Sequence, residues 1–117
     1  MNKVNLVGRL TRDPELRSTT EGKKVGNFKL AVRSAWKNAN GERKVDYIPV
    51  VVWSKQAEFC SQYLAKGSLV AVAGRIQVRS FDRDGQTQWM TEVVADSVQF
   101  LEKRNADQYE QESESAV

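Results

Sequence analysis

The chain has 117 residues, the size of one domain, because a second hydrophobic core could not be filled from so short a sequence. It contains no histidine and one cysteine, Cys60, which excludes His-based acid–base pairs, Cys/His metal sites and internal disulfides. Residues 1–104 hold all 18 cations and 11 of the 15 anions, so a basic body of +7 and an acidic end of −4 lie behind the net +3, an asymmetry that favours contact with a polyanion.

Strand patterns dominate the chain as far as residue 101. Alternating apolar and polar residues rich in Val predict strands over residues 4–9, 25–36, 45–53, 68–81 and 87–101. The polar segment 11–24 is predicted to be a loop, because it contains two turn dipeptides. Asn40-Gly41 predicts a tight hairpin turn with two positive-φ positions, and Asp84-Gly85 predicts a second hairpin.

One helix is predicted over residues 55–66. Here apolar residues recur every three to four positions instead of every two. Its apolar face comprises Ala57, Phe59, Cys60, Tyr63 and Leu64. Ser54 can cap the start and Gly67 can end the helix. On this face Cys60 is predicted to be a small buried core residue without chemistry, and Tyr63 is assigned to packing.

Five strands with a helix between the third and the fourth are typical of an all-β OB-fold, a five-stranded Greek-key barrel. This domain is predicted to span residues 1–104. The remaining residues, 105–117, are polar and acidic and are predicted to form a short disordered tail.

Alternation also separates the two faces of the strands. The predicted core positions are Phe28, Leu30, Val32, Ile48, Val50, Val52, Val70, Val72, Gly74, Ile76 and Val78. The opposite positions include Tyr47, Trp53, Arg75, Arg79 and Phe81. Simple parity assigns Trp36 to the core, but a bulge or strand end near Ser34 would expose it.

Interleaved aromatic and basic side chains on outward positions predict binding of single-stranded nucleic acid. Bases stack on aromatic rings whatever their identity, and Lys and Arg neutralise the phosphates between them. Such binding needs no metal, no cofactor and no catalytic residue, so the chain is not expected to be an enzyme. Structural roles stay open for several rings. Trp53 could lie in the core, Phe81 at the barrel end and Tyr47 in a subunit interface. Trp89 could lie in the core or in a subunit interface.

Four segments resemble the bacterial single-stranded DNA-binding proteins, from residue 1 to about residue 101. They are NKVNLVGRLTRDPELR, DYIPVVVWSKQAE, YLAKGSLVAVAGRIQVRS and TEVVADSVQFL. The resemblance implies an OB-fold that assembles as a homotetramer and wraps single-stranded DNA in replication, recombination and repair. By position it places the stacking aromatics at Trp36, Tyr47, Trp53 and Phe81. The outward cations expected to bind phosphate are Arg33, Lys37, Arg43, Lys44, Arg75 and Arg79.

The sequence departs from the family pattern in two places. Ile48 stands where members often carry a His at a subunit contact. The acidic end lacks the long linker and the Asp-Asp-Ile-Pro-Phe type of tip that recruits partner enzymes, so recruitment through this tail is not expected. A short paralogue of the kind associated with DNA uptake, a phage or plasmid protein, and a truncated chain all remain open.

A second function class also remains open, an OB-fold protein-interaction module of a primosome-like assembly. In either class the protein is expected in the cytoplasm, associated with the nucleoid if it binds DNA. No membrane contact is expected, because no run of apolar residues approaches the length of a membrane-spanning helix.

Overall fold

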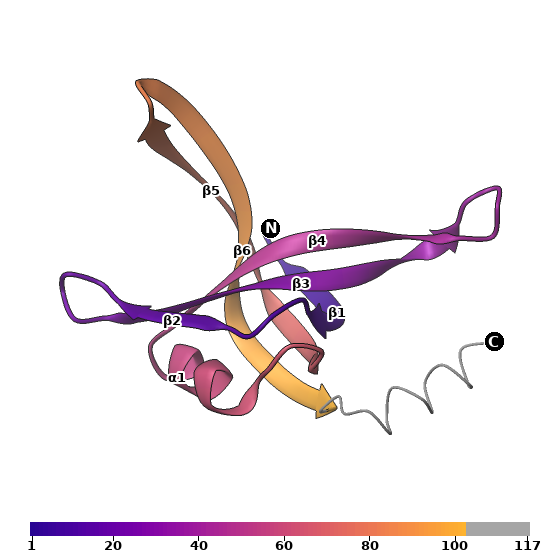
Figure 1. Ribbon diagram of the computed structural model, residues 1–117, viewed down its shortest axis with the longest axis horizontal. Helices are drawn as coiled ribbons and strands as arrows, with labels where there is room; N and C mark the ends of the chain where they lie inside the picture. The colour runs from indigo at the N-terminus through magenta and orange to yellow at the C-terminus, as the bar shows by residue number, and fades with distance from the viewer. Residues whose placement is uncertain (103–117) are drawn as a thin grey trace.

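A computed structural model of the chain describes residues 1–102, so the predicted acidic tail, residues 105–117, lies outside the described residues. Six strands and one helix make up this part (Figure 1). Their bounds are β1 Val4–Leu10, β2 Glu15–Ser18, β3 Lys24–Lys37, β4 Arg43–Trp53, α1 Ser54–Tyr63, β5 Leu69–Arg83 and β6 Gln86–Glu102.

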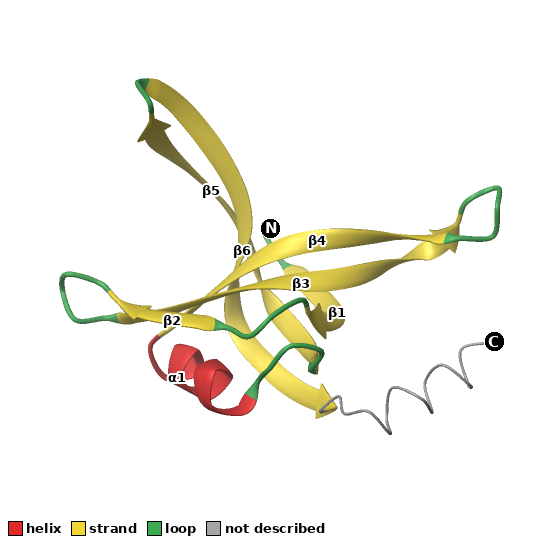
Figure 2. Ribbon diagram, viewed as in Figure 1, coloured by secondary structure: helices red, strands yellow, loops and turns green. Residues whose placement is uncertain are grey.

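The strands form one sheet that closes into a barrel. Its order is β1-β5-β6-β4-β3-β2, and β1 also pairs with β3, which joins the two ends of a five-stranded barrel and leaves β2 as an additional strand. β4 and β6 run parallel, and the other pairs are antiparallel. The single helix lies between β4 and β5 in the chain, at one end of the barrel (Figure 2). The predicted OB-fold is therefore confirmed.

The extra strand β2 lies inside the segment that was predicted to be a loop. Residues 15–18 pair antiparallel with residues 24–27 of β3. All four residues of β2 are exposed, so the strand has no buried face and no apolar alternation that would reveal it in the sequence.

Most of the strand positions that were predicted to be buried lie in the barrel core. Leu30, Val50, Val52 and Val70 are almost completely buried, and α1 adds Cys60, which is also fully buried. Burial raises the pKa of the Cys60 thiol to about 11. A thiol in this state is a core side chain, as predicted, and not a nucleophile.

The helix differs from the prediction at both ends. It begins at Ser54, whose φ is 55° and whose side chain makes no capping hydrogen bond, because β4 runs directly into the helix through Trp53. It ends at Tyr63, before the predicted Gly67, whose N–H instead donates to the carbonyl of Leu10. Within residues 1–102 no helix has the length and apolar content that crossing a membrane requires.

Long hairpins project from the barrel as two-stranded arms (Figure 1). We call residues 33–45 the β3–β4 arm and residues 76–92 the β5–β6 arm. The predicted turn at Asp84-Gly85 is confirmed, with φ values of 53° and 78°. At the other tip Gly41 has a positive φ and Asn40 does not, because Oδ1 of Asn38 accepts the N–H groups of Asn40 and Glu42 and holds a longer loop.

The predicted burial of Ile76 and Val78 is wrong. They are 47 % and 56 % exposed, because β5 continues past the barrel as one strand of the β5–β6 arm. The pairing of β1 with β5 ends at Gly74, where the register of β5 and β6 also shifts. A Cβ at Gly74 would lie 2.1 Å from the carbonyl oxygen of Val94, so glycine permits the close backbone approach at the base of the arm.

Candidate nucleic-acid interface

The four aromatic residues singled out in the sequence lie at the surface in different degrees. Trp36 is 83 % exposed, Tyr47 62 % and Trp53 41 %, while Phe81 is half-buried. The alternative that places Trp53 in the core is therefore wrong. All four belong to the strands that form or continue into the two arms.

Trp36 lies in a bulge of β3 and is exposed because this part of β3 belongs to the β3–β4 arm, outside the barrel. Arg33 pairs with Val45 and Lys37 pairs with Arg43, so three residues of β3 lie opposite one residue of β4. The N–H of Trp36 donates to Oγ of Ser34 at 3.1 Å inside this bulge. The predicted irregularity near Ser34 is confirmed.

The register places most of the predicted site on one outward face of the adjacent strands β5, β6, β4 and β3. Val51 of β4 pairs with Val94 of β6, which in turn pairs with Arg75 of β5, so these three side chains point to the same side. Alternation along each strand then gives the members of the face, which include Tyr47, Trp53, Arg75, Arg79 and Phe81.

Trp36 lies on the other side of the β3–β4 arm. Lys37 pairs with Arg43, which shares the parity of Tyr47, and neighbouring residues of a strand point in opposite directions. A single-stranded nucleic acid that contacts both Tyr47 and Trp36 must therefore pass around the edge of this arm.

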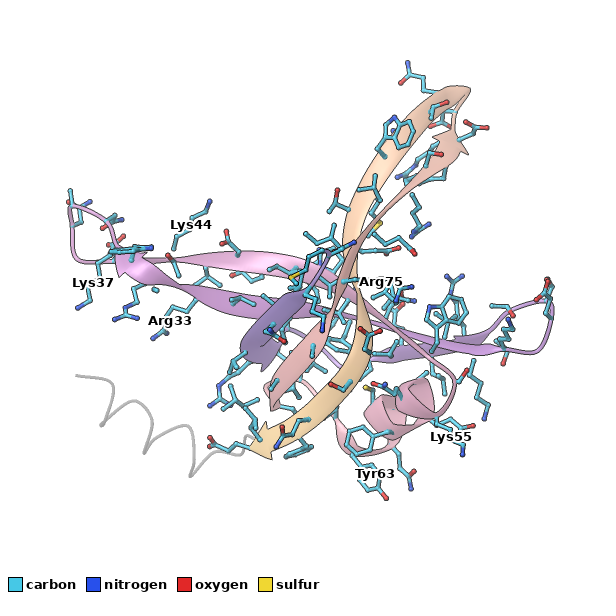
Figure 3. All side chains as sticks on the ribbon, turned by 180° about the vertical axis from the view of Figure 1, so that it is seen from behind. Arg33, Lys37, Lys44, Lys55, Tyr63 and Arg75 are labelled. Atoms are coloured by element: carbon cyan, nitrogen blue, oxygen red, sulfur yellow. The ribbon has the colours of Figure 1, made fainter. Side chains whose placement is uncertain are left out.

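Basic side chains gather toward the end of the β3–β4 arm. Figure 3 shows Arg33, Lys37 and Lys44 along this arm, and Arg43 is exposed beside them. Nζ of Lys44 lies 3.5 Å from Oδ1 of Asp46, in an ion pair with both side chains largely exposed. Exposed pairs of this kind are weak, so Lys44 can exchange its partner for a phosphate.

Two arginines of β5 are held by carboxylates to different degrees. Arg75 lies at the base of the β5–β6 arm (Figure 3), with Nη1 3.4 Å from Oδ1 of the exposed Asp96. Nε of Arg79 donates at 2.8 Å to Oε1 of Glu92, a side chain that is 3 % exposed. The Arg75–Asp96 pair is therefore open to solvent, whereas Arg79 pairs with a buried carboxylate.

The candidate stacking rings do not stack on one another. Among residues 1–102 the aromatic pair in contact is Phe59 and Tyr63 of α1, with centroids 5.2 Å apart and planes tilted by 44°. Tyr63 is nevertheless 55 % exposed, so its assignment to packing holds only for this contact. Among residues 1–102, no ring–ring contact covers the rings of the outward face.

Sequence reasoning did not place Trp89, which the structure shows to be 71 % exposed on β6. It pairs with Ser80, whereas Phe81 pairs with Gln88, so Trp89 and Phe81 lie on opposite faces of the β5–β6 arm. Counting back from the two-residue turn at Asp84-Gly85 would have given this register. The alternative that buries Trp89 in the core is wrong.

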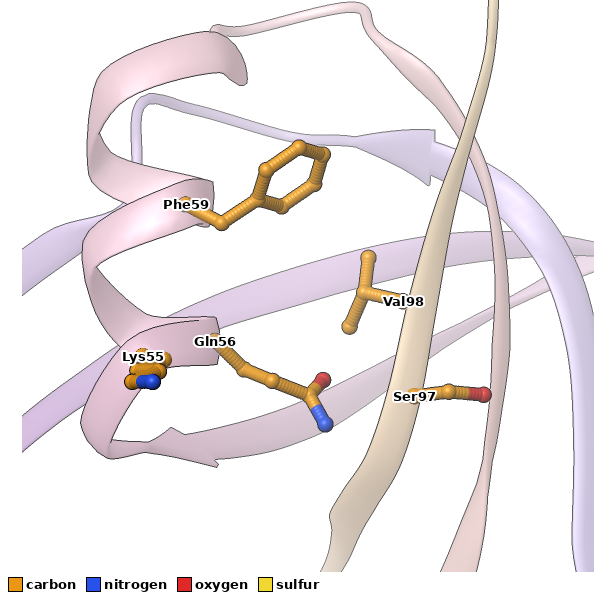
Figure 4. Close-up of a pocket in the computed structure, with 5 residues that line it drawn as sticks. All are labelled: Lys55, Gln56, Phe59, Ser97 and Val98. Carbon is orange, nitrogen blue, oxygen red and sulfur yellow. The ribbon is translucent and has the colours of Figure 1, made fainter.

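A cavity of about 230 Å³ lies between α1 and β6 (Figure 4). It is lined by Lys55, Gln56, Phe59, Ser97 and Val98. Nε2 of Gln56 donates to the carbonyl of Asp96, and Oε1 is buried without a hydrogen-bond partner among residues 1–102. In that same part of the chain no cluster of three or more Cys, Asp or Glu side chains could hold a metal ion.

Comparison with known proteins agrees with this geometry. Residues 1–101 match the single-strand binding protein family. The chain belongs to this family. A relative from Staphylococcus aureus named single-stranded DNA-binding protein 2 is 58 % identical over 106 residues, which cover 90 % of this chain and 75 % of the relative.

Two further relatives carry similar names. Single-stranded DNA-binding protein 1 of another Staphylococcus aureus strain is 52 % identical over 113 residues, or 96 % of this chain and 72 % of the relative. A single-stranded DNA-binding protein of Halalkalibacterium halodurans is 57 % identical over 107 residues, or 91 % of this chain and 64 % of that protein. This member of the family thus matches its relatives over nearly all of its described residues.

Proposed function

We propose that this protein binds single-stranded DNA without sequence preference. Bases stack on Trp36, Tyr47, Trp53 and Phe81, and phosphates are neutralised by Arg33, Lys37, Arg43, Lys44 and Arg75. The observation that carries the proposal is the group of exposed rings and cations on the outward strand faces and arms. The names of the relatives support the same ligand.

The chemistry of this surface favours unpaired strands. A base stacked on an aromatic ring contributes about 1–3 kcal/mol, and every base has a π-face to offer. In a duplex those faces are already stacked on neighbouring bases, so the rings have nothing to bind. The phosphate contacts add affinity that falls as salt rises.

The protein is proposed to act as a non-catalytic binder that protects single strands in replication, recombination, repair or DNA uptake. We also propose a location in the cytoplasm, associated with the nucleoid. Stacking and charge neutralisation need neither a metal ion nor a cofactor.

Titration with oligo(dT) tests the proposal through tryptophan emission. Trp36 and Trp53 should stack on bases, so their fluorescence should be quenched as the oligonucleotide is added at low salt. Tryptophan emission that stays unchanged at saturating oligonucleotide would exclude stacking on these two rings.

We further propose that the chain assembles as a homotetramer. Val7 of β1 and Ile76 and Val78 of β5 are apolar side chains about half exposed or more in the single chain, and a subunit contact would remove them from water. Light scattering should then give a mass four times that of the 13.2 kDa chain. A mass equal to that of one chain at micromolar concentration would exclude the tetramer.

A further inference from the structure

A buried acid lies within the outward face that carries the proposed binding residues. Glu92 of β6 pairs with Gln77 of β5 and shares the face of Phe81, yet its side chain is 3 % exposed. A carboxylate in such a position needs a cation or hydrogen-bond donors. Nε of Arg79 and Nε2 of Gln77 supply them, at 2.8 and 3.3 Å from the same oxygen, Oε1.

Three contacts hold the guanidinium of Arg79. Besides the hydrogen bond to Glu92, Nη2 lies 3.5 Å from Sδ of Met90, the residue opposite Arg79 in the ladder. The guanidinium carbon lies 5.8 Å from the centroid of the Phe81 ring, within the range of a cation–π interaction. Arg79 is thereby fixed beside a ring that is proposed to stack on a base.

Burial separates this ion pair from the others near the proposed site. Both side chains of the Arg75–Asp96 pair are about half exposed or more, at 49 % and 68 %. Such a pair opens at little cost. If Arg79 moved to a phosphate, Glu92 would be left as an unpaired buried charge, and that penalty exceeds the gain from one solvent-exposed phosphate contact. Arg79 should therefore stay on Glu92 when a strand is bound.

We infer, on the basis of the single-strand binding proposed above, that Glu92 is a positioning residue that keeps Arg79 against Phe81 and withholds its charge from the DNA backbone. The pair is neutral as a unit, so it displaces no counterion from the strand. Arg79 then widens the stacking surface of Phe81, although its outward position alone would group it with the phosphate-binding cations.

The salt dependence of oligo(dT) binding tests this role, because it counts the phosphate charges that are neutralised. The slope of log K against log salt changes by about 0.7 for each contact to a single strand. Glu92→Gln leaves the charge of Arg79 uncompensated, so its slope should be steeper than that of the unchanged protein by about 0.7 for each subunit that contacts the strand.

The double variant Arg79→Met/Glu92→Gln removes both charges and leaves no buried carboxylate unpaired. It should keep the slope of the unchanged protein while its affinity falls. Arg33→Met is the matched control for a cation that contacts phosphate, and its slope should be shallower by about 0.7 per subunit.

Two results would overturn the inference while the proposed function stands. One is a double variant with a slope as shallow as that of Arg33→Met, which would mean that Arg79 neutralises a phosphate in the unchanged protein. The other is an unaltered slope in Glu92→Gln, which would mean that Glu92 does not keep the charge of Arg79 from the DNA backbone. If the unchanged protein failed to bind oligo(dT), the proposed function would fall, and this inference with it.

Discussion

The double substitution Tyr47→Ala/Trp53→Ala is expected to weaken oligo(dT) binding by about 2–6 kcal/mol, since each lost ring removes about 1–3 kcal/mol of stacking. Both residues lie on the outward face of β4, six positions apart, so each can serve a different base. A loss of this size corresponds to at least about a 30-fold rise in Kd. Fluorescence anisotropy of a labelled oligonucleotide measures it.

Tyr63→Ala is the matched control for this double variant. Tyr63 is an exposed aromatic residue of α1, outside the proposed site, and its removal should leave oligo(dT) affinity unchanged. Circular dichroism should show the same fold for both variants, because the three rings lie outside the barrel core. If the double variant bound oligo(dT) as tightly as the control, stacking on Tyr47 and Trp53 would be excluded.

Alternation of apolar and polar residues was sufficient to predict the barrel and the sides of its strands. Val50 and Val52 were predicted inside and are buried, whereas Trp53 was predicted outside and is exposed. A strand with one buried face repeats its pattern every two residues, so each side chain can be assigned from its neighbours.

The same alternation could not show where a strand leaves the barrel. Ile76 and Val78 continue the pattern of Val70 and Val72, but they face solvent on the β5–β6 arm. Val70 and Val72 lie where β5 pairs with β1, and this pairing ends at Gly74, before Ile76 and Val78. Because the pairing joins segments that are distant in the chain, the local sequence does not show where it ends.

The cluster around Glu92 was hidden for a similar reason. Its ion pair with Arg79 joins two strands across the Asp84-Gly85 turn, and a buried charge can be found only when the register and the burial are both known. The bulge at Ser34 could be predicted, because a tryptophan next to Lys37 and a turn is poorly suited to a core.

The most direct test of single-strand binding compares one mixed-sequence oligonucleotide with its own duplex at the same salt concentration. Four rings at no less than about 1 kcal/mol each predict a preference of about a thousand-fold for the single strand, because the duplex hides its base faces and retains only the phosphates. Equal affinity for the single strand and the duplex would show that the protein binds through phosphate charge alone. That result would contradict base stacking on Trp36, Tyr47, Trp53 and Phe81.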